Sequence, residues 1–184
     1  MRCSFGGVLL IAGFMLVPAT VVAQQDEAMH EVGVDLGMFY QKPSSNRGVF
    51  NVGTPIDVRL GIPIHGWTLE PRVGFTFQSS SIGSAHDVNL DLNAVLPVGS
   101  GSSYRKGMYL TAGGGLDFKG GNVQGFPSPD ATLAQLNAGI GTRVPYGPAA
   151  IRFETYMKYH FRDRNIGYTN TFDIGVRVGL SLWH

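Results

Sequence analysis

Cysteine is almost absent from this 184-residue sequence, in which Cys3 is the single one. Cys3 stands before an apolar run and not at its end, so its position does not fit the acylation site of a lipoprotein. One cysteine so close to the start excludes a disulfide framework and thiolate catalysis in the rest of the chain.

Long apolar runs are absent too, apart from residues 5–17 near the start, and this run is too short to span a bilayer. Pro18 ends the run, and Ala23 supplies the small residue that precedes a cleavage point. The sequence therefore predicts a cleavable secretory signal peptide over residues 1–23. A retained anchor helix and cleavage after Ala19 remain alternatives.

An excess of charge of either sign is lacking as well. Removal of residues 1–23 takes away Arg2 and leaves 13 basic and 13 acidic residues. This balance offers no basic surface to nucleic acid, so a nucleic-acid partner is not expected. Beyond residue 23 there is no run of 18 apolar residues, which argues against a helical membrane span. We expect residues 24–30 to be a polar N-terminal stub and residues 31–184 to form one domain.

The sequence does contain a sustained alternation of apolar and polar residues, which is typical of β-strands. Each segment has about ten residues, which at a tilt near 40° rise about 25 Å, the height of the apolar band of a transmembrane barrel. The predicted fold class is all-β, an eight-stranded antiparallel up-and-down transmembrane β-barrel. The expected strands are 31–40, 55–64, 68–78, 87–96, 107–118, 133–144, 150–161 and 171–183.

The connections alternate in length. Short turns are expected at 65–67 and 145–148, on the periplasmic side, and long extracellular loops on the other side. Two features fit this scheme poorly: the segment 97–106 is too long for a periplasmic turn, and Pro71 removes a hydrogen-bond donor inside a strand. We expect Pro71 to lie near the periplasmic rim or at a bulge. The predicted long loops are 41–54, 79–86, 119–132 and 162–170.

Alternation by itself leaves two kinds of barrel open. A soluble periplasmic, lipocalin-like barrel turns its apolar face inward around a hydrophobic ligand, whereas a transmembrane barrel turns it toward lipid. Here the polar face mixes acids and bases, which can neutralise one another inside a narrow lumen. The predicted lumen charge network consists of Asp35, Asp57, Arg59, Glu70, Arg72, Asp91, Asp117, Arg143, Arg152, Glu154, Lys158, Asp173 and Arg177.

Glycines and aromatic residues also favour the transmembrane barrel. Glycines such as Gly141 and Gly175 lie on the polar face, where large lumen side chains from neighbouring strands need room. Aromatic residues fall near strand ends, as expected for girdles at the two boundaries between water and lipid. The predicted girdle residues are Tyr40, Trp67, Phe77, Phe118, Tyr146, Tyr159, Phe161, Phe172 and Trp183.

Over residues 30–184 this pattern resembles the small outer-membrane β-barrel superfamily, which includes the transmembrane domain of outer-membrane protein A. The last strand, with apolar residues at every second position from Phe172 to Leu182 followed by Trp183, resembles the C-terminal signal that the barrel assembly machinery recognises. That signal normally ends in Phe or Trp, whereas His184 follows here. The resemblance implies export through the Sec pathway, residence in the outer membrane, contact with outer-membrane lipid and lipopolysaccharide, and a monomer.

Residues with catalytic chemistry are few. His160 resembles the catalytic histidine of outer-membrane lipid A deacylases, in which a serine follows two positions later, but Arg162 stands at that position here. The other histidines lack the paired spacing of metal ligands, and no cofactor is expected. We expect a non-enzymatic barrel with a side-chain-filled lumen that serves envelope structure or surface interaction through its loops. A soluble ligand-binding barrel and a lipid A hydrolase remain alternatives.

Overall fold

The computed structural model describes residues 30–43, 49–51, 55–80, 83–100, 102–103, 105–123, 126–162 and 169–184. The predicted signal peptide (1–23) and all but the last residue of the predicted stub lie outside these ranges. No helix in the described part is long and apolar enough to cross a membrane. The strands are β1 (Glu31–Pro43), β2 (Val49–Asn51), β3 (Ile56–Ile64), β4 (Trp67–Ser80), β5 (Gly83–Val98), β6 (Gly107–Val123), β7 (Phe126–Tyr146), β8 (Ala149–His160) and β9 (Thr171–Trp183).

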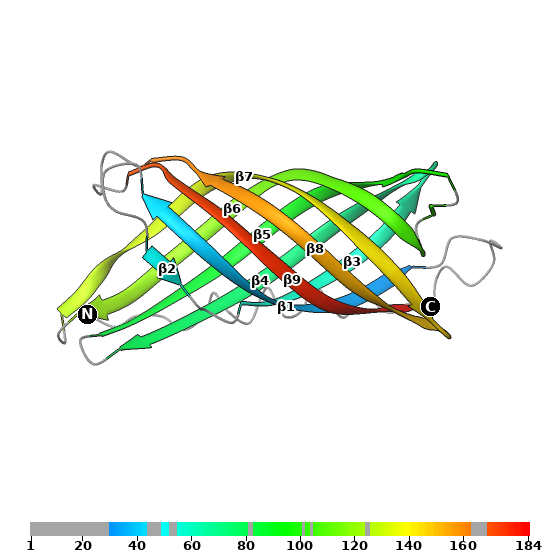
Figure 1. The fold of residues 1–184 in the computed structure, drawn as a ribbon. Helices are drawn as coiled ribbons and strands as arrows, with labels where there is room; N and C mark the ends of the chain where they lie inside the picture. Colours follow the sequence, from blue (N-terminus) through cyan, green and yellow to red (C-terminus); the bar gives the residue numbers. More distant parts are fainter. Residues whose placement is uncertain are drawn as a thin grey trace, which may run out of the picture.

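The strands form a closed antiparallel barrel with tilted strands (Figure 1). From β3 to β9 each strand pairs with the next along the chain, and β1 pairs with both β3 and β9. The β1–β9 seam is continuous from Glu31 opposite Trp183 to Pro43 opposite Thr171. The short β2 pairs with β1 beyond the end of β3, so it adds no ninth position to the wall. The predicted eight-stranded up-and-down barrel is confirmed.

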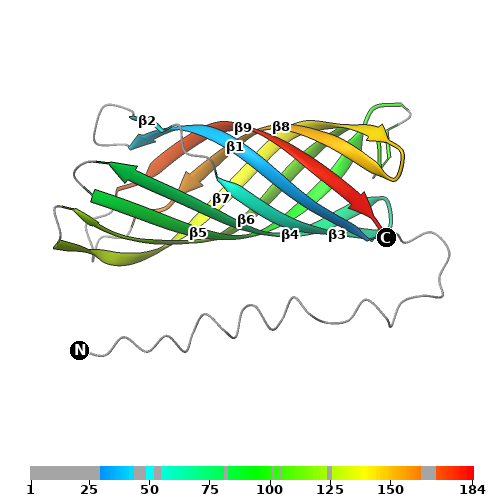
Figure 2. The ribbon, with the colours of Figure 1, turned by 90° about the horizontal axis from the view of Figure 1, so that it is seen from below.

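One end of the barrel, which we call the turn end, carries the tight turns, the beginning of β1 and the end of β9, as Figure 2 shows. Ile64 pairs with Trp67 across a turn in which His65 and Gly66 have φ angles of 40° and 94°. Positive φ at both central residues is typical of a type I′ turn, whose twist matches that of the flanking strands. The second turn places Gly147, with φ of 58°, before Pro148, as a type II′ turn requires.

The opposite end, which we call the loop end, differs from the prediction at three of the predicted loops. Within the predicted loop 41–54, β1 continues to Pro43 and β2 covers Val49–Asn51. The predicted loop 79–86 is largely strand, because β4 continues to Ser80 and pairs there with Gly83 of β5. The predicted loop 119–132 is also largely strand, with Val123 of β6 opposite Phe126 of β7. Gly, Ser and Asn in these segments suggested loops, but each strand obtains its backbone hydrogen bonds from its hairpin partner whatever its side chains are.

Pro71 lies in β4, four residues from the start of the strand at the turn end. It pairs with Leu92 of β5, while toward β3 the ladder is interrupted between the pair Arg59–Arg72 and the pair Ile62–Leu69. The register is the same on both sides of the interruption. The missing proline N–H therefore costs ladder contacts without a bulge, and the position near the turn end is as predicted.

Burial decides which face of the wall is inside. Leu36 and Val178 are 56% and 49% exposed on the outer wall, whereas Arg59 and Arg152 are each 1% exposed in the lumen. A soluble barrel would show the opposite arrangement, because it must hide its apolar face from water. The lipocalin-like alternative is therefore wrong for this chain, and the interior of the molecule is a polar, ionised lumen.

Candidate functional site

All thirteen charged residues expected in the lumen are buried there, each less than 9% exposed. The structure joins ten charged residues of the lumen into one continuous set of ion pairs, which we call the arginine network. Its members are Glu31, Asp35, Asp57, Arg59, Glu70, Arg72, Arg143, Arg152, Glu154 and Arg177.

Arg59 of β3 joins three strands at the turn end. Its Nε donates to Asp35 of β1 at 2.9 Å, and its Nη2 donates to Ser181 of β9 at 2.7 Å. Its Nη1 contacts Glu31 of β1 and lies 3.8 Å from Glu70 of β4. A planar guanidinium with five N–H donors suits this position, because it can satisfy several buried acceptors at once.

Arg152 of β8 lies at the centre of the network. It pairs with Glu70, and its Nη2 donates to Glu154 at 2.5 Å. Its Nε donates to the hydroxyl of Tyr109 at 2.5 Å, and that hydroxyl donates to Glu154 at 3.1 Å. The guanidinium groups of Arg143 and Arg152 lie 4.7 and 4.6 Å from the centre of the Tyr109 ring. These cation–π contacts stack three large groups across the lumen.

Arg72 and Arg177 extend the network toward the loop end. Arg72 donates to Glu70 at 2.6 Å and lies 3.5 Å from Glu154. Arg177 lies 3.2 Å from both Asp57 and Glu154. Glu70 and Glu154 are thus each shared by two or more guanidinium groups, so the buried charges compensate one another.

The remaining lumen charges form a second set together with His160 and the neutral amides of Asn89 and Gln135. We call this set the loop-end cluster: Asp87, Asn89, Asp91, Asp117, Lys119, Gln135, Lys158, His160 and Asp173. Lys158 donates to Asp91 at 2.9 Å and to Asn89 at 3.1 Å. Gln135 donates to Asp91 at 2.5 Å. Lysine and amides replace arginine here, so fewer donors serve each carboxylate.

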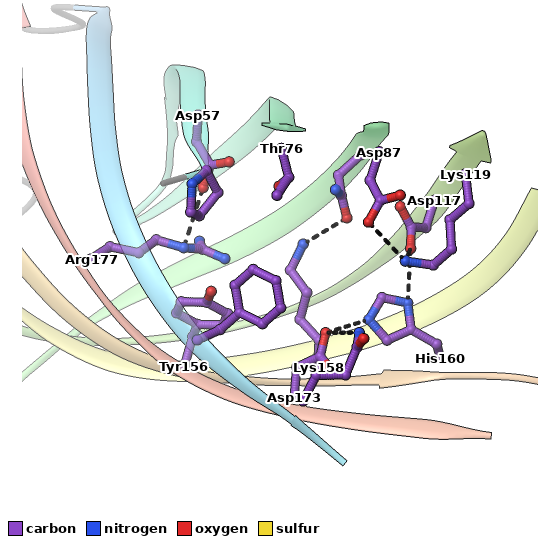
Figure 3. A pocket seen from close by; sticks show the side chains of 14 residues that line it. Asp57, Thr76, Asp87, Asp117, Lys119, Tyr156, Lys158, His160, Asp173 and Arg177 are labelled. Atoms are coloured by element: carbon purple, nitrogen blue, oxygen red, sulfur yellow. Dashed lines mark hydrogen bonds and ion pairs between the residues drawn. The ribbon is translucent and has the colours of Figure 1, made fainter. Parts of the chain in front are cut away.

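His160, the last residue of β8, lies between two carboxylates in this cluster (Figure 3). Its Nε2 is 2.9 Å from Asp173 of β9, and its Nδ1 is 3.3 Å from Asp117 of β6. Lys119 in turn pairs with Asp117 at 2.8 Å and with Asp87 at 3.0 Å. The imidazole therefore links strands on both sides of β8 inside the lumen.

The position of His160 does not suit the lipid A hydrolase alternative. His160 is 2% exposed and faces the lumen, whereas the lipid that a lipid A hydrolase would act on lies against the outer wall. Arg162, at the position of the family serine, is exposed beyond the strand end. Within the described ranges no three His, Cys, Asp or Glu side chains come together as a metal site.

Glycines make room for the large lumen side chains. A Cβ at Gly33 would meet the guanidinium of Arg59, and a Cβ at Gly141 would meet the hydroxyl end of Tyr109. Gly175 gives the same space to the ring of Tyr156. This is the role expected for glycine on the polar face of a narrow barrel.

A small cavity remains in the loop-end half of the lumen, with a volume of about 30 Å³ for water-sized molecules (Figure 3). It is lined by Asp57 and Arg177 of the arginine network and by residues of the loop-end cluster that include Asp117, Lys119, His160 and Asp173. At the turn end Val95, Tyr109 and Ala150 are fully buried. The lumen is therefore packed with side chains at the turn end and hollow toward the loop end.

Three lumen charges were not in the predicted set. Glu31 begins β1, and Asp87 and Lys119 lie at the edges of the segments predicted as loops. Strand alternation could have identified them, because residues two positions apart share a face. Glu31 is two residues before Gly33, and Lys119 is two residues after Asp117.

Eight of the nine predicted girdle residues lie on the outer face, and Trp183 does not. Phe77 and Tyr146, at opposite ends of the wall, are 75% and 79% exposed, and Tyr159 packs edge-on against Phe161. Trp183 follows Leu182 and so shares the alternation of the lumen residue Ser181. Its assignment to the outer girdle is therefore wrong, because strand alternation places it on the lumen face.

Trp183 instead takes part in closing the turn end. The guanidinium of Arg105, in the connection between β5 and β6, lies 5.1 Å from its ring centre. Two strands separate β6 from β9, so this connection reaches across the opening of the barrel. The connection is folded by bonds from Ser102 Oγ to the carbonyl of Val98 and from the N–H of Ser103 to the carbonyl of Lys106. Pro97 and Val98 belong to β5, so the connection is 99–106, and its length lets Arg105 reach Trp183.

Comparison with solved structures identifies the fold. Neisserial surface protein A superposes with a TM-score of 0.65 at 11% identity, over 83% of this chain and 96% of that one. A major outer membrane protein from Thermus thermophilus gives 0.61 at 10%, over 86% and 100%. Ail, the attachment invasion locus protein of Yersinia pestis, gives 0.57 at 11%, over 86% and 99%. Another structure of Ail, in complex with the heparin analogue sucrose octasulfate, gives 0.51 at 10%, over 85% and 99%.

No protein-family model and no curated protein matches the sequence. At such low identities the likeness is one of fold, and it agrees with the strand order, the closed seam and the outward apolar wall described above. The chain has the fold of the small eight-stranded outer-membrane β-barrels.

Proposed function

We propose that this chain is a monomeric outer-membrane protein whose wall contacts acyl chains and whose lumen is closed to solutes. It serves the envelope as a structural barrel or as a surface-interaction protein acting through its loop end. Residues 1–23 direct export through the Sec pathway, and the barrel assembly machinery inserts the barrel by way of β9.

The main support for this proposal is the distribution of polarity, which is the inverse of that in a water-soluble protein: apolar side chains are outside and charges are inside. Twenty-nine large apolar side chains of the described residues are exposed, while the charges of the arginine network are buried. A water-soluble protein rarely leaves more than a few hundred Å² of contiguous apolar surface uncovered. A wall that is apolar on all sides needs an apolar solvent, and acyl chains supply it.

The two ends give the orientation. Outer-membrane barrels have short turns on the periplasmic side and longer extracellular connections. The turn end, with its two-residue turns at 65–66 and 147–148, accordingly faces the periplasm. The loop end, with the extended β4–β5 and β6–β7 hairpins, faces outward. The headgroups of outer-membrane lipid and lipopolysaccharide are then the immediate neighbours of the rims.

Two of the structural neighbours support a role at the cell surface. One is named a surface protein and another an attachment invasion locus protein, and the latter binds a heparin analogue in one of its structures. In this chain the packed arginine network argues for a structural or surface role rather than for transport, because the packed turn-end half of the lumen leaves no open path. Wide pores use about sixteen strands or more.

Membrane fractionation combined with gel migration before and after heating tests the proposal. We expect the protein in the outer-membrane fraction, with residues 1–23 removed, and a folded form that migrates differently from the heated form. Recovery from the periplasm without detergent would contradict the assignment.

A further inference from the structure

The two halves of the lumen differ in charge balance. The arginine network contains five carboxylates and five guanidinium groups, so its formal charge is zero. In the loop-end cluster four carboxylates, those of Asp87, Asp91, Asp117 and Asp173, share two lysines and His160. Counted over the described residues, this cluster has a formal charge of −2 with His160 neutral and −1 with His160 charged.

Two of these carboxylates have an oxygen without a partner. Asp117 Oδ1 and Asp173 Oδ1 are buried and accept no hydrogen bond within the part of the chain that the structure describes. Both residues are at least nine-tenths buried, at 1% and 5% exposure, and both line the cavity. Both carboxylates are paired through Oδ2, but a buried carboxylate oxygen that accepts no hydrogen bond is unfavourable, so each Oδ1 atom has room for a further donor or a cation.

The cavity limits what can be bound. Its volume of about 30 Å³ admits one or two water-sized particles and no organic solute. Water would supply hydrogen bonds but no charge, whereas a small cation would supply positive charge and would coordinate the carboxylate oxygens directly. Carboxylate oxygens suit hard cations. Calcium takes six to eight oxygen ligands, but no three suitable side chains of the described residues converge, which argues against calcium.

We propose that the loop-end half of the lumen binds one small monovalent cation, of the size of sodium, potassium or ammonium, beside Asp117 and Asp173. The cation offsets the excess of carboxylates that Lys119, Lys158 and His160 leave uncompensated. This inference goes beyond the proposed function and depends on the folded barrel alone, so it holds whichever cell fraction contains the protein.

The proposal is tested on the barrel refolded in detergent, with folding verified by gel migration. Crystals grown in rubidium chloride should show an anomalous peak in the lumen beside Asp117 and Asp173. At equal ionic strength, the midpoint of thermal unfolding should be about 3–5 °C higher in potassium chloride than in choline chloride, when potassium is tenfold above its dissociation constant. Parallel runs in sodium and ammonium chloride identify the preferred ion.

Asp173→Asn and Asp117→Asn should each weaken both the peak and the dependence on the salt cation, because each removes one carboxylate charge beside the cavity. Asp130→Asn is the matched control, because Asp130 is exposed and does not line the cavity, so this variant should behave as the unmodified protein. A folded barrel without a lumen peak and with equal midpoints in all salts would overturn the proposal. If the lumen variants do not fold, the measurements on the unmodified protein still decide the question.

Discussion

Arg152 is the charged residue at the centre of the lumen, contacting Glu70, Glu154 and Tyr109. We expect Arg152→Met to lower the free energy of unfolding by about 3–5 kcal/mol, because it leaves buried carboxylates short of a partner. The double variant Arg152→Met/Glu70→Gln should be less damaging, since it removes one charge of each sign. Urea unfolding of the barrel in lipid vesicles measures both. Equal destabilisation by the single and double variants would contradict the charge-pairing account.

Gly33 tests whether the glycines of the lumen make room for particular neighbours. The three atoms nearest to a Cβ at this position all belong to the guanidinium of Arg59. We expect Gly33→Ala to cost about 1–3 kcal/mol in the unmodified protein and clearly less when Arg59→Ala is already present. A double-mutant cycle by urea unfolding gives the coupling. Additive effects would mean that Gly33 matters for its backbone and not for this contact.

At the residue scale the sequence revealed which side chains enter the lumen, but not which of them pair. Alternation assigns a face independently of the exact strand ends, and so all thirteen predicted charges are buried. Pairing depends on strand register and on reach across the lumen, as in the contact of Arg143 with Glu31, 112 residues apart in the chain. Glu31 and Lys119 were missed because polar residues at segment ends do not differ from loop residues in composition.

At the scale of an element, strand β9 offers a test of how much the apolar wall contributes to stability. Val178 is 49% exposed, and it pairs with Leu36 of β1 and Phe153 of β8, whose side chains are also exposed on the wall. We expect Val178→Lys to lower the free energy of unfolding in vesicles by about 2–4 kcal/mol, as for a charge placed near the bilayer midplane.

Tyr146→Lys is the matched control for this substitution. Tyr146 is 79% exposed at the end of β7 beside a turn, so the added charge meets headgroups and water, and the effect should be small. Equal costs at the two positions would show that the wall has no apolar band.

Strand ends were the least predictable feature of the elements. β9 has the predicted bounds, Thr171–Trp183, because its alternation is unbroken and polar residues flank it. The β6–β7 hairpin extends to Val123 and Phe126 through a segment rich in glycine and proline that resembles a loop. Beyond the apolar band nothing requires alternation, and pairing with the neighbouring strand alone maintains the extended conformation.

For the whole molecule, the packed lumen predicts the absence of a stable pore. In planar lipid bilayers the refolded barrel should give no large, long-lived conductance steps, because the arginine network and the Arg105–Trp183 contact obstruct the turn end. Large, steady steps recorded from a monomeric, correctly folded sample would mean that the lumen opens, and the side-chain-filled lumen would then be wrong.

The central claim is that the apolar wall faces acyl chains. Residues 30–184 contain no cysteine, so single spin labels can be placed at Ile140→Cys and Val178→Cys on the wall and at Thr111→Cys in the lumen. In vesicles, the two wall labels should be relaxed strongly by lipid-soluble oxygen and weakly by a water-soluble nickel chelate, while the lumen position should be closed to both. Strong relaxation of the wall labels by the nickel chelate would contradict the account.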